Sequence, residues 1–205
     1  MDQHPAVPAG AEDTRGPARR RRADAQRNVD ALLDAARSVF ATSGVDAPAK
    51  EITDLAGVGV GTLYRHFPQR ADLIKAVVES NIDAVADAGP ALSAAYAPEE
   101  ALTRWIDRFT ELLSTKRGLA SALHSGDPAF EGLPGYFMQR LGPTLTNLLD
   151  AAAAAGAIRG DIGAEDLLHA IAQLFHTVRD RGPEHGRRMV GVLVDGLRHG
   201  ATRQR

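Results

Sequence analysis

Residues 57–67 read GVGVGTLYRHF, and this stretch decides the fold. Gly57 favours the end of a short helix that the pattern predicts over about 48–56. A second short helix is predicted over about 59–66, and Pro68 ends it because proline disfavours helical backbone at the residue before it. A tight turn that contains glycine therefore joins the two helices.

A longer helix precedes this pair. Apolar residues repeat at spacings of three and four over about 24–43, which is the pattern of an amphipathic helix. We expect Ile52 and Leu55 of the second helix, and Val60 and Leu63 of the third, to face inward and pack. Three helices in this order form a helix-turn-helix, whose last helix enters the major groove of DNA.

The third helix carries the polar groups that such a role needs. Thr62, Tyr64, Arg65 and His66 supply hydrogen-bond donors and an aromatic ring on its outward side. Gly61 has no side chain, so the backbone at the start of the helix can approach phosphates closely. Another interpretation of the glycines, a dinucleotide-binding loop, is excluded because they follow a helix and not a strand.

These motifs resemble the signature of the TetR/AcrR family of transcriptional regulators. The resemblance rests on residues 57–67 together with 35–40 (AARSVF) and 51–57 (EITDLAG), and it covers about residues 25–80. Thr53 stands where the family often has alanine; its side chain could pack or reach a phosphate, and we expect it to pack.

The resemblance implies DNA contacts at the matching positions. Thr62, Tyr64 and His66 would hold phosphates or thymine methyl groups, and Arg65 would read guanine or contact a phosphate. Arg70 opens the next helix, at a position where the family usually has a cation on the DNA backbone. The predicted DNA-binding residues are Gly61, Thr62, Tyr64, Arg65, His66 and Arg70.

The rest of the chain is predicted to be helical as well. No alternating β-branched run argues for a strand, and Gly89-Pro90 is expected to stop the first of these helices. The predicted helices cover about 70–88, 99–115, 136–155, 164–180 and 184–199, with a short piece near 119–123. The predicted fold is all-α, with a disordered basic tail over 1–23, a helix-turn-helix domain over 24–70, and a helical effector-binding and dimerisation domain over 71–205.

Residues 105–109 (WIDRF) and 116–119 (KRGL) are similar to the C-terminal domain of the SbtR-like branch of the family, which implies a small-molecule pocket and a dimer face. The predicted pocket residues are Trp105, Phe109, His124, Phe137, Met138, Leu141 and Phe175. The predicted dimer residues are Leu167, Ile171, Leu174, Val178, Val190, Leu193, Val194 and Leu197. Packing inside the chain's own domain explains both sets too, and both interpretations stay open.

Composition limits the class of protein further. The 205 residues include no cysteine, which excludes disulfides, a thiol nucleophile and cysteine-ligated metal centres. No stretch approaches the ~20 apolar residues of a spanning helix, and no secretory signal opens the sequence, so we expect a cytoplasmic protein without a membrane partner. Residues 15–75 hold 11 basic and 7 acidic residues within a net charge of −2, which favours a polyanion at that end. The run Arg19–Arg22 is either a solvated patch or an arm on DNA.

No catalytic, metal or cofactor site is expected. His169 and His176 are seven residues apart, about 10.5 Å along a helix, which is too far for both to bind one zinc ion. Residues 121–127 contain Ser, His and Asp side chains, yet they lie in one short segment without a nucleophile elbow.

We therefore expect a ligand-responsive, homodimeric transcription regulator, a repressor that a small-molecule effector releases from a pseudo-palindromic operator. Two recognition helices would enter successive major grooves about one helical turn apart. Two alternatives stay open. A sequence-nonspecific DNA-binding module would show strong salt dependence and little sequence preference. A small-molecule-binding helical protein without regulatory DNA binding would tolerate changes at Tyr64 and Arg65.

Overall fold

The computed structural model describes residues 17–115, 119–123, 125–177 and 182–199, and all the regular elements in these ranges are helical. The predicted all-α fold is confirmed. The α-helices are α1 (Pro17–Thr42), α2 (Ala49–Ala56), α3 (Val60–His66), α4 (Arg70–Ala95), α5 (Pro98–Thr115), α6 (Ala120–Leu123), α7 (Leu133–Ala154), α8 (Ala164–Thr177) and α9 (Pro183–His199), with a 3-10 helix, η2, at Pro128–Phe130.

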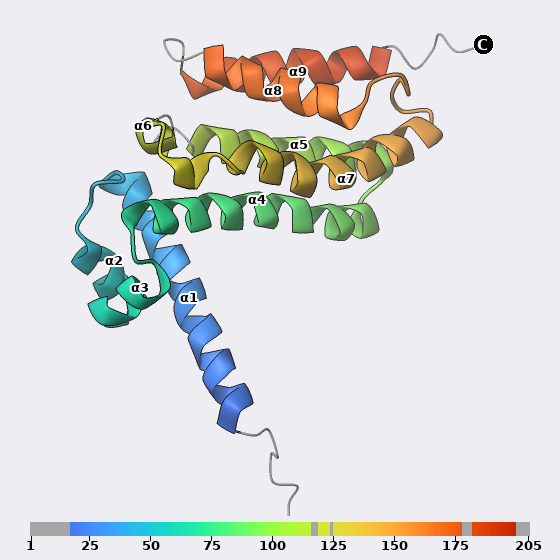
Figure 1. The fold of residues 1–205 in the computed structure, drawn as a ribbon. Coiled ribbons are helices and arrows are strands. Elements are labelled where there is room, and N and C mark those ends of the chain that lie inside the picture. The colour runs from blue at the N-terminus through green and yellow to red at the C-terminus, as the bar shows by residue number, and fades with distance from the viewer. Residues whose placement is uncertain (1–16, 116–118, 124, 178–181, 200–205) are drawn as a thin grey trace, which may run out of the picture.

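The helices are arranged in layers around α4 (Figure 1). The helices α1, α2 and α3 lie at one end of α4, and α1 packs against it. On its other side α4 packs against α5 and α7, and these in turn carry α8 and α9. The α4 helix therefore connects the N-terminal helices to the rest of the molecule.

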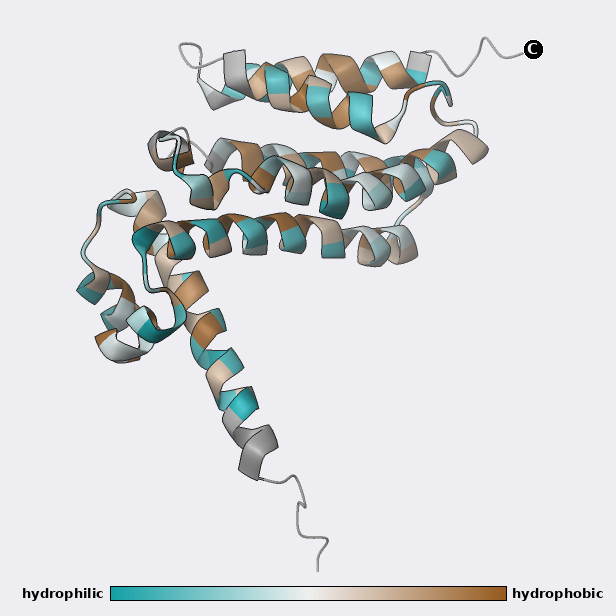
Figure 2. Cartoon of the chain, viewed as in Figure 1, coloured by the Kyte–Doolittle hydropathy of each residue, from teal (hydrophilic) through white to brown (hydrophobic). Residues whose placement is uncertain are grey.

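The core runs through both parts of the molecule. Leu32, Ile52 and Leu63 are buried where α1, α2 and α3 meet, and Trp105 and Leu141 are buried between the long helices. Hydrophobic and hydrophilic residues are interleaved along α1, as the predicted amphipathic pattern requires (Figure 2). In the part of the chain that the structure describes, no helix is long and apolar enough to cross a membrane.

The first helix is longer than predicted. It begins at Pro17, so that residues 17–23, which we expected to belong to the tail, are helical. Proline suits the first turn of a helix because its missing N–H would have no partner there. From Arg22 to Arg27 the side chains are exposed, and this end of α1 projects away from the other helices (Figure 1).

The expected stop at Gly89-Pro90 is wrong, because α4 continues through Pro90 to Ala95. A proline inside a helix leaves the carbonyl four residues earlier without its usual N–H partner. Here that carbonyl belongs to Ala86, and the hydroxyl of Thr144 from α7 donates to it over 3.3 Å. A side chain from a neighbouring helix thus satisfies the group that Pro90 leaves unpaired.

Gly89 makes this close approach possible. A Cβ atom at position 89 would lie 2.2 Å from Cγ2 of Thr144. We expect Gly89→Ala to lower the free energy of unfolding by about 1–2 kcal/mol, because overpacking outweighs the gain in helix propensity. Denaturant unfolding measures the change.

Two further variants control this prediction. An added Cβ at Gly142 in α7 meets nothing within 4 Å, so Gly142→Ala should raise stability slightly. Adding Thr144→Ser to Gly89→Ala removes the clashing methyl group and keeps the hydroxyl, so it should restore most of the loss. Equal effects at the two glycines would contradict the predicted close contact.

Candidate nucleic-acid interface

The turn between α2 and α3 depends on Gly57. This residue has φ 68° and ψ 28°, a left-handed conformation that glycine adopts without strain. The N–H of Val58 donates to the carbonyl of Thr53 over 3.1 Å and closes the end of α2. Gly59 then caps α3, and its carbonyl accepts from the N–H of Thr62 over 2.8 Å. The helix-turn-helix geometry that the sequence predicted is present.

The buried side of the pair differs in part from the prediction. Ile52 and Leu63 are buried as expected. Leu55 is 61% exposed because Ile52 and Thr53 define the buried side of α2, and Leu55 lies on its flank. Val60 is 40% exposed because it begins α3, and this first turn extends past the core. The inward orientation predicted for these two side chains is therefore wrong.

Thr53 packs as expected. Its side chain is buried, and its hydroxyl donates to the carbonyl of Lys50 over 3.1 Å. The hydrogen bond stays within α2 and satisfies the buried hydroxyl. Thr53 thus belongs to the support of the helix pair.

The polar residues of α3 lie together on its accessible side. Gly61 and Arg65 are exposed, and Tyr64 is 53% exposed. Thr62 and His66 are half-buried at the edge of the same helix. A tyrosine with half of its surface in water is not a core aromatic, so its ring and hydroxyl are available to a partner. Phe67, by contrast, is buried and closes α3 against the core.

Arg70 is placed differently from the other predicted DNA contacts. Its Nε atom donates to the carbonyl of Val45 over 2.6 Å, and its guanidinium lies 5.2 Å from the ring centre of Phe40. Its Nη2 atom is buried and has no hydrogen-bond partner among the described residues. These contacts connect α4 to the end of α1, and a DNA contact by Arg70 stays a prediction.

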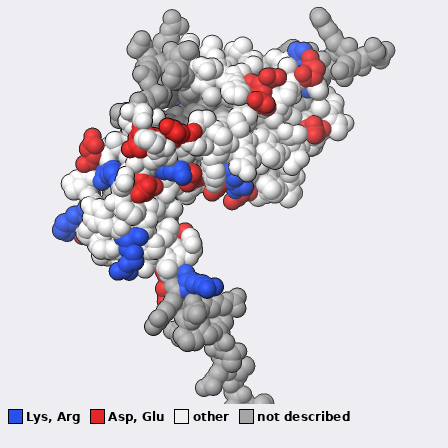
Figure 3. Space-filling view, in the orientation of Figure 1, with Lys and Arg blue, Asp and Glu red and all other residues white. Residues whose placement is uncertain are grey.

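Basic side chains gather over the helix-turn-helix. Lys50 and Arg65 are exposed on α2 and α3, and Arg22 and Arg27 are exposed on the projecting part of α1. In Figure 3 the Lys and Arg atoms over these N-terminal helices face outward, while acidic atoms are more frequent over the other helices. Lys50 was not among the residues predicted from the sequence, and it forms an exposed ion pair with Asp54 at 2.6 Å. The side chains of residues 17–21 lie outside what the structure describes, so a role of the Arg19–Arg22 run stays a prediction.

Polar side chains connect the N-terminal helices to α4. Arg37 of α1 donates to Asn81 over 2.6 Å and to Ser80 over 3.2 Å. Both acceptors lie in the middle of α4.

One turn further along, α4 is connected to α7. Asp83 accepts hydrogen bonds from Tyr136 over 2.7 Å and from Arg140 over 2.5 Å, and Arg140 also donates to Asp87 over 2.9 Å. Burial raises the pKa of the Tyr136 hydroxyl, and the bond to Asp83 raises it further. The two sets of contacts therefore connect α4 both to α1 and to α7.

Most of the predicted effector-pocket residues lie in the core or against it. Trp105, Phe109 and Leu141 are each 0% exposed and belong to the core. The Trp105 and Phe109 rings stack with centres 5.8 Å apart, and Phe109 also meets Phe137 at 5.6 Å. Their burial favours the interpretation as a plain core, and a ligand pocket at these residues stays a prediction. Met138 and Phe175 are half-buried against the same core, and His124 lies outside the described residues.

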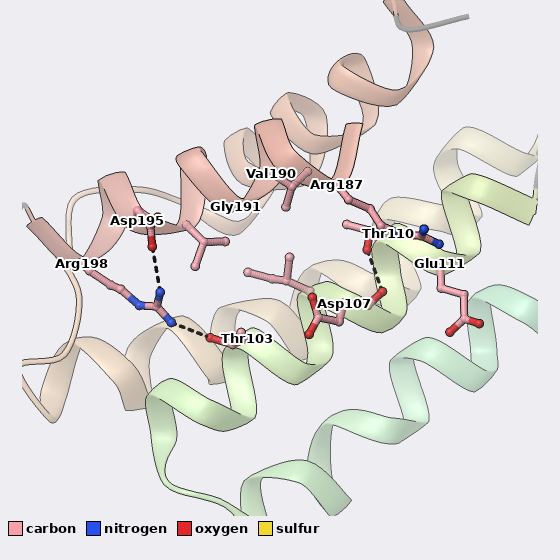
Figure 4. A pocket seen from close by; sticks show the side chains of 11 residues that line it. Thr103, Asp107, Thr110, Glu111, Arg187, Val190, Gly191, Asp195 and Arg198 are labelled. Atoms are coloured by element: carbon pink, nitrogen blue, oxygen red, sulfur yellow. Dashed lines mark hydrogen bonds and ion pairs between the residues drawn. The ribbon is translucent and has the colours of Figure 1, made fainter. Parts of the chain in front are cut away.

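A groove lies between α5 and α9 (Figure 4). None of the predicted pocket residues lines it. No group of three His, Asp or Glu side chains within the described ranges is placed to hold a metal ion.

The dimer prediction also needs correction. Leu167, Ile171, Val190, Val194 and Leu197 are buried within their own chain. Buried side chains have little surface left for a second subunit, so these five pack inside the domain. Leu174 and Leu193 are half-buried, and Val178 lies outside the described residues.

Comparisons with known proteins agree with these observations. The family profile for bacterial regulatory proteins of the tetR family matches residues 32–77, and the profile for the C-terminal domain of SbtR-like transcriptional regulators matches residues 97–199. The TetR transcriptional regulator SCO0520 from Streptomyces coelicolor is 39% identical, with a TM-score of 0.70 over 83% of this chain and 98% of that one.

Two further proteins are similar. A TetR transcription regulatory protein from Mycobacterium vanbaalenii is 35% identical, with a TM-score of 0.66 over 86% of this chain and 98% of that one. The HTH-type transcriptional regulator SAR0097 of Staphylococcus aureus is 37% identical over 68 residues, which is 32% of this chain and 35% of that relative. The similarity to this curated relative thus spans about a third of its length.

Proposed function

Because the chain belongs to the TetR family of helix-turn-helix transcriptional regulators, we propose that it is a ligand-responsive repressor that binds a pseudo-palindromic operator as a homodimer. The observation that carries the proposal is the accessible side of α3, where Tyr64 and Arg65 are exposed beside Thr62 and His66. A short helix that is fixed by buried residues and polar on its outer side suits the major groove. As a DNA-binding protein it would act in the cytoplasm.

Each polar residue of α3, together with Gly61 and with Lys50 of α2, has a proposed role. Arg65 reads guanine or holds a phosphate, since a guanidinium donates two parallel hydrogen bonds to either group. Tyr64, Thr62 and His66 contact phosphates or thymine methyl groups. Gly61 lets the helix approach the backbone, because an added Cβ there would occupy open space that DNA needs. Lys50 adds a phosphate contact at the start of α2.

Repression and its release are tested by transcription in vitro. We expect the protein to reduce transcription from a promoter that overlaps a duplex it selects, in proportion to occupancy of that duplex. An effector that binds the DNA-free form better would restore transcription, by no more than its difference in affinity for the two forms. An increase in transcription on binding would make the protein an activator and contradict the repressor role.

We place the dimer face on the outer side of α8 and α9. Val192 of α9 is 65% exposed, the largest exposure among the large hydrophobic residues that are described as exposed. Leu174 and Leu193 are partly buried against the core and retain some surface. In a two-fold symmetric dimer each of these side chains occurs twice in one interface, so a small apolar patch is doubled.

Val192→Glu should therefore dissociate the dimer. A carboxylate would be buried twice without a partner, and we expect the dimer dissociation constant to rise by about 100-fold or more. Sedimentation equilibrium measures this constant. Leu55→Glu is the matched control, because it introduces the same charge at an exposed apolar residue of α2 and should leave the dimer intact. An unchanged dimer dissociation constant in the Val192→Glu variant would mean that the interface lies elsewhere.

A further inference from the structure

The groove between α5 and α9 has the form of a small-molecule site (Figure 4). Its volume is about 420 Å³, within the range of pockets that hold drug-sized ligands. Ile106 of α5 and Val190 and Val194 of α9 are buried side chains that line it, so its floor is apolar. Polar and charged side chains of the same two helices stand around this floor.

Gly191 opens the middle of the groove. It lies inside α9, where glycine costs about 1 kcal/mol relative to alanine. An added Cβ at this position would meet nothing within 4 Å. A side chain at this position would therefore begin in open space beside the groove.

The charges around the groove favour a cation. The two arginines that line it are already paired, Arg187 with Glu184 at 2.5 Å and Arg198 with Glu99 at 2.7 Å. In Figure 4 Asp107 projects from α5 toward α9. Its carboxylate accepts no hydrogen bond and forms no ion pair with the residues that the structure describes. An anion would thus have to compete with carboxylates that already hold these arginines, whereas a cation would meet a carboxylate that is in no ion pair with the described residues.

We propose that this groove binds an organic ammonium compound, with its apolar part over Ile106, Val190 and Val194 and its ammonium group beside Asp107. The proposal rests on the proposed function in one respect, since such a compound would act there as the effector. Because α5 packs against α4, and α4 holds α1 through Arg37, a ligand between α5 and α9 is coupled by contacts to the helix-turn-helix.

Three compounds of similar shape but different charge test which class of ligand the groove binds. The probes are 4-phenylbutylammonium, 4-phenylbutanol and 4-phenylbutyrate, titrated calorimetrically into the full chain without DNA. For a ligand of this size we expect a dissociation constant on the order of 1 mM for the cation. Since Asp107 is exposed, the cation should bind about threefold to fivefold tighter than the alcohol. The anion should bind most weakly. Equal or tighter binding of the anion, or no binding of any probe, would overturn the proposal.

Three variants locate the site. Gly191→Leu should fill the groove and weaken the cation at least tenfold, without lowering the melting temperature. Gly135→Leu is the matched control, since Gly135 is an exposed glycine of α7 whose added Cβ also meets nothing, and it should bind like the wild type. Asp107→Asn should reduce cation affinity to that of the alcohol and leave the alcohol unchanged. Unaltered binding by Gly191→Leu would overturn the proposal.

Operator binding by the same preparations, measured without probe, tests the proposed function separately. Retained operator binding with no probe binding overturns the groove alone. Probe binding that follows the predicted series, without operator binding, supports the groove and overturns the proposed function.

Discussion

Tyr64→Ala is expected to weaken operator binding roughly 100-fold. The Tyr64 side chain is 53% exposed on the accessible side of α3, so its removal disturbs little of the core. A hydrogen bond to a charged group contributes about 1.5 kcal/mol or more, and a dimer would lose two of them. Fluorescence anisotropy with a duplex that the wild type selects measures the loss.

Two controls make this result specific. Tyr96→Ala removes another partly exposed tyrosine, at the end of α4, and should leave operator affinity unchanged. Sedimentation of Tyr64→Ala should show the wild-type oligomeric state. Operator affinity within threefold of the wild type in Tyr64→Ala would remove this residue from the interface and favour a protein that does not read DNA through α3.

Trp105→Ala is expected to lower the free energy of unfolding by about 3–5 kcal/mol, the range for a large buried aromatic side chain. Trp105 is 0% exposed, it stacks on Phe109, and its Nε1 atom donates to the carbonyl of Val85 over 2.9 Å. Its truncation leaves a cavity and removes the hydrogen bond between the indole and the Val85 carbonyl. Urea denaturation, followed by circular dichroism because the single tryptophan is lost, measures the change.

The same variants distinguish a packed core around Trp105 from the ligand pocket that the sequence predicted there. Trp105→Phe should lose less stability than Trp105→Ala, because it keeps the ring and loses only the hydrogen bond and part of the volume. A loss under 1 kcal/mol in Trp105→Ala would mean that the site is already hollow, and would restore Trp105 as a candidate pocket residue.

The helix-turn-helix could be predicted from the sequence because its signals are local. Gly57 ends α2, Pro68 follows α3, and the spacing of apolar residues indicates the amphipathic first helix. The course of α4 through Pro90 could not be predicted in this way. The hydroxyl that donates to the Ala86 carbonyl comes from Thr144 in another helix. The local sequence around Pro90 does not indicate this hydrogen bond.

The C-terminal surfaces were predicted less well for a related reason. Apolar periodicity shows that Ile171 and Val194 are buried, but it does not show whether their own chain or a second copy covers them. Val192 lies outside the apolar stripe, and its exposure is visible only in the structure. The groove is likewise a property of the space between α5 and α9, to which Gly191 contributes by having no side chain.

Selection of bound duplexes from a random pool by the wild-type protein shows whether a homodimer reads a specific operator. We expect enrichment of an inverted repeat whose half-sites are centred about one helical turn, roughly 34–36 Å, apart. Affinity for the selected duplex should exceed that for random duplex by about 1,000-fold or more at physiological salt. Salt-dependent binding without any enriched sequence would contradict this expectation, because phosphate contacts alone would then account for the interaction.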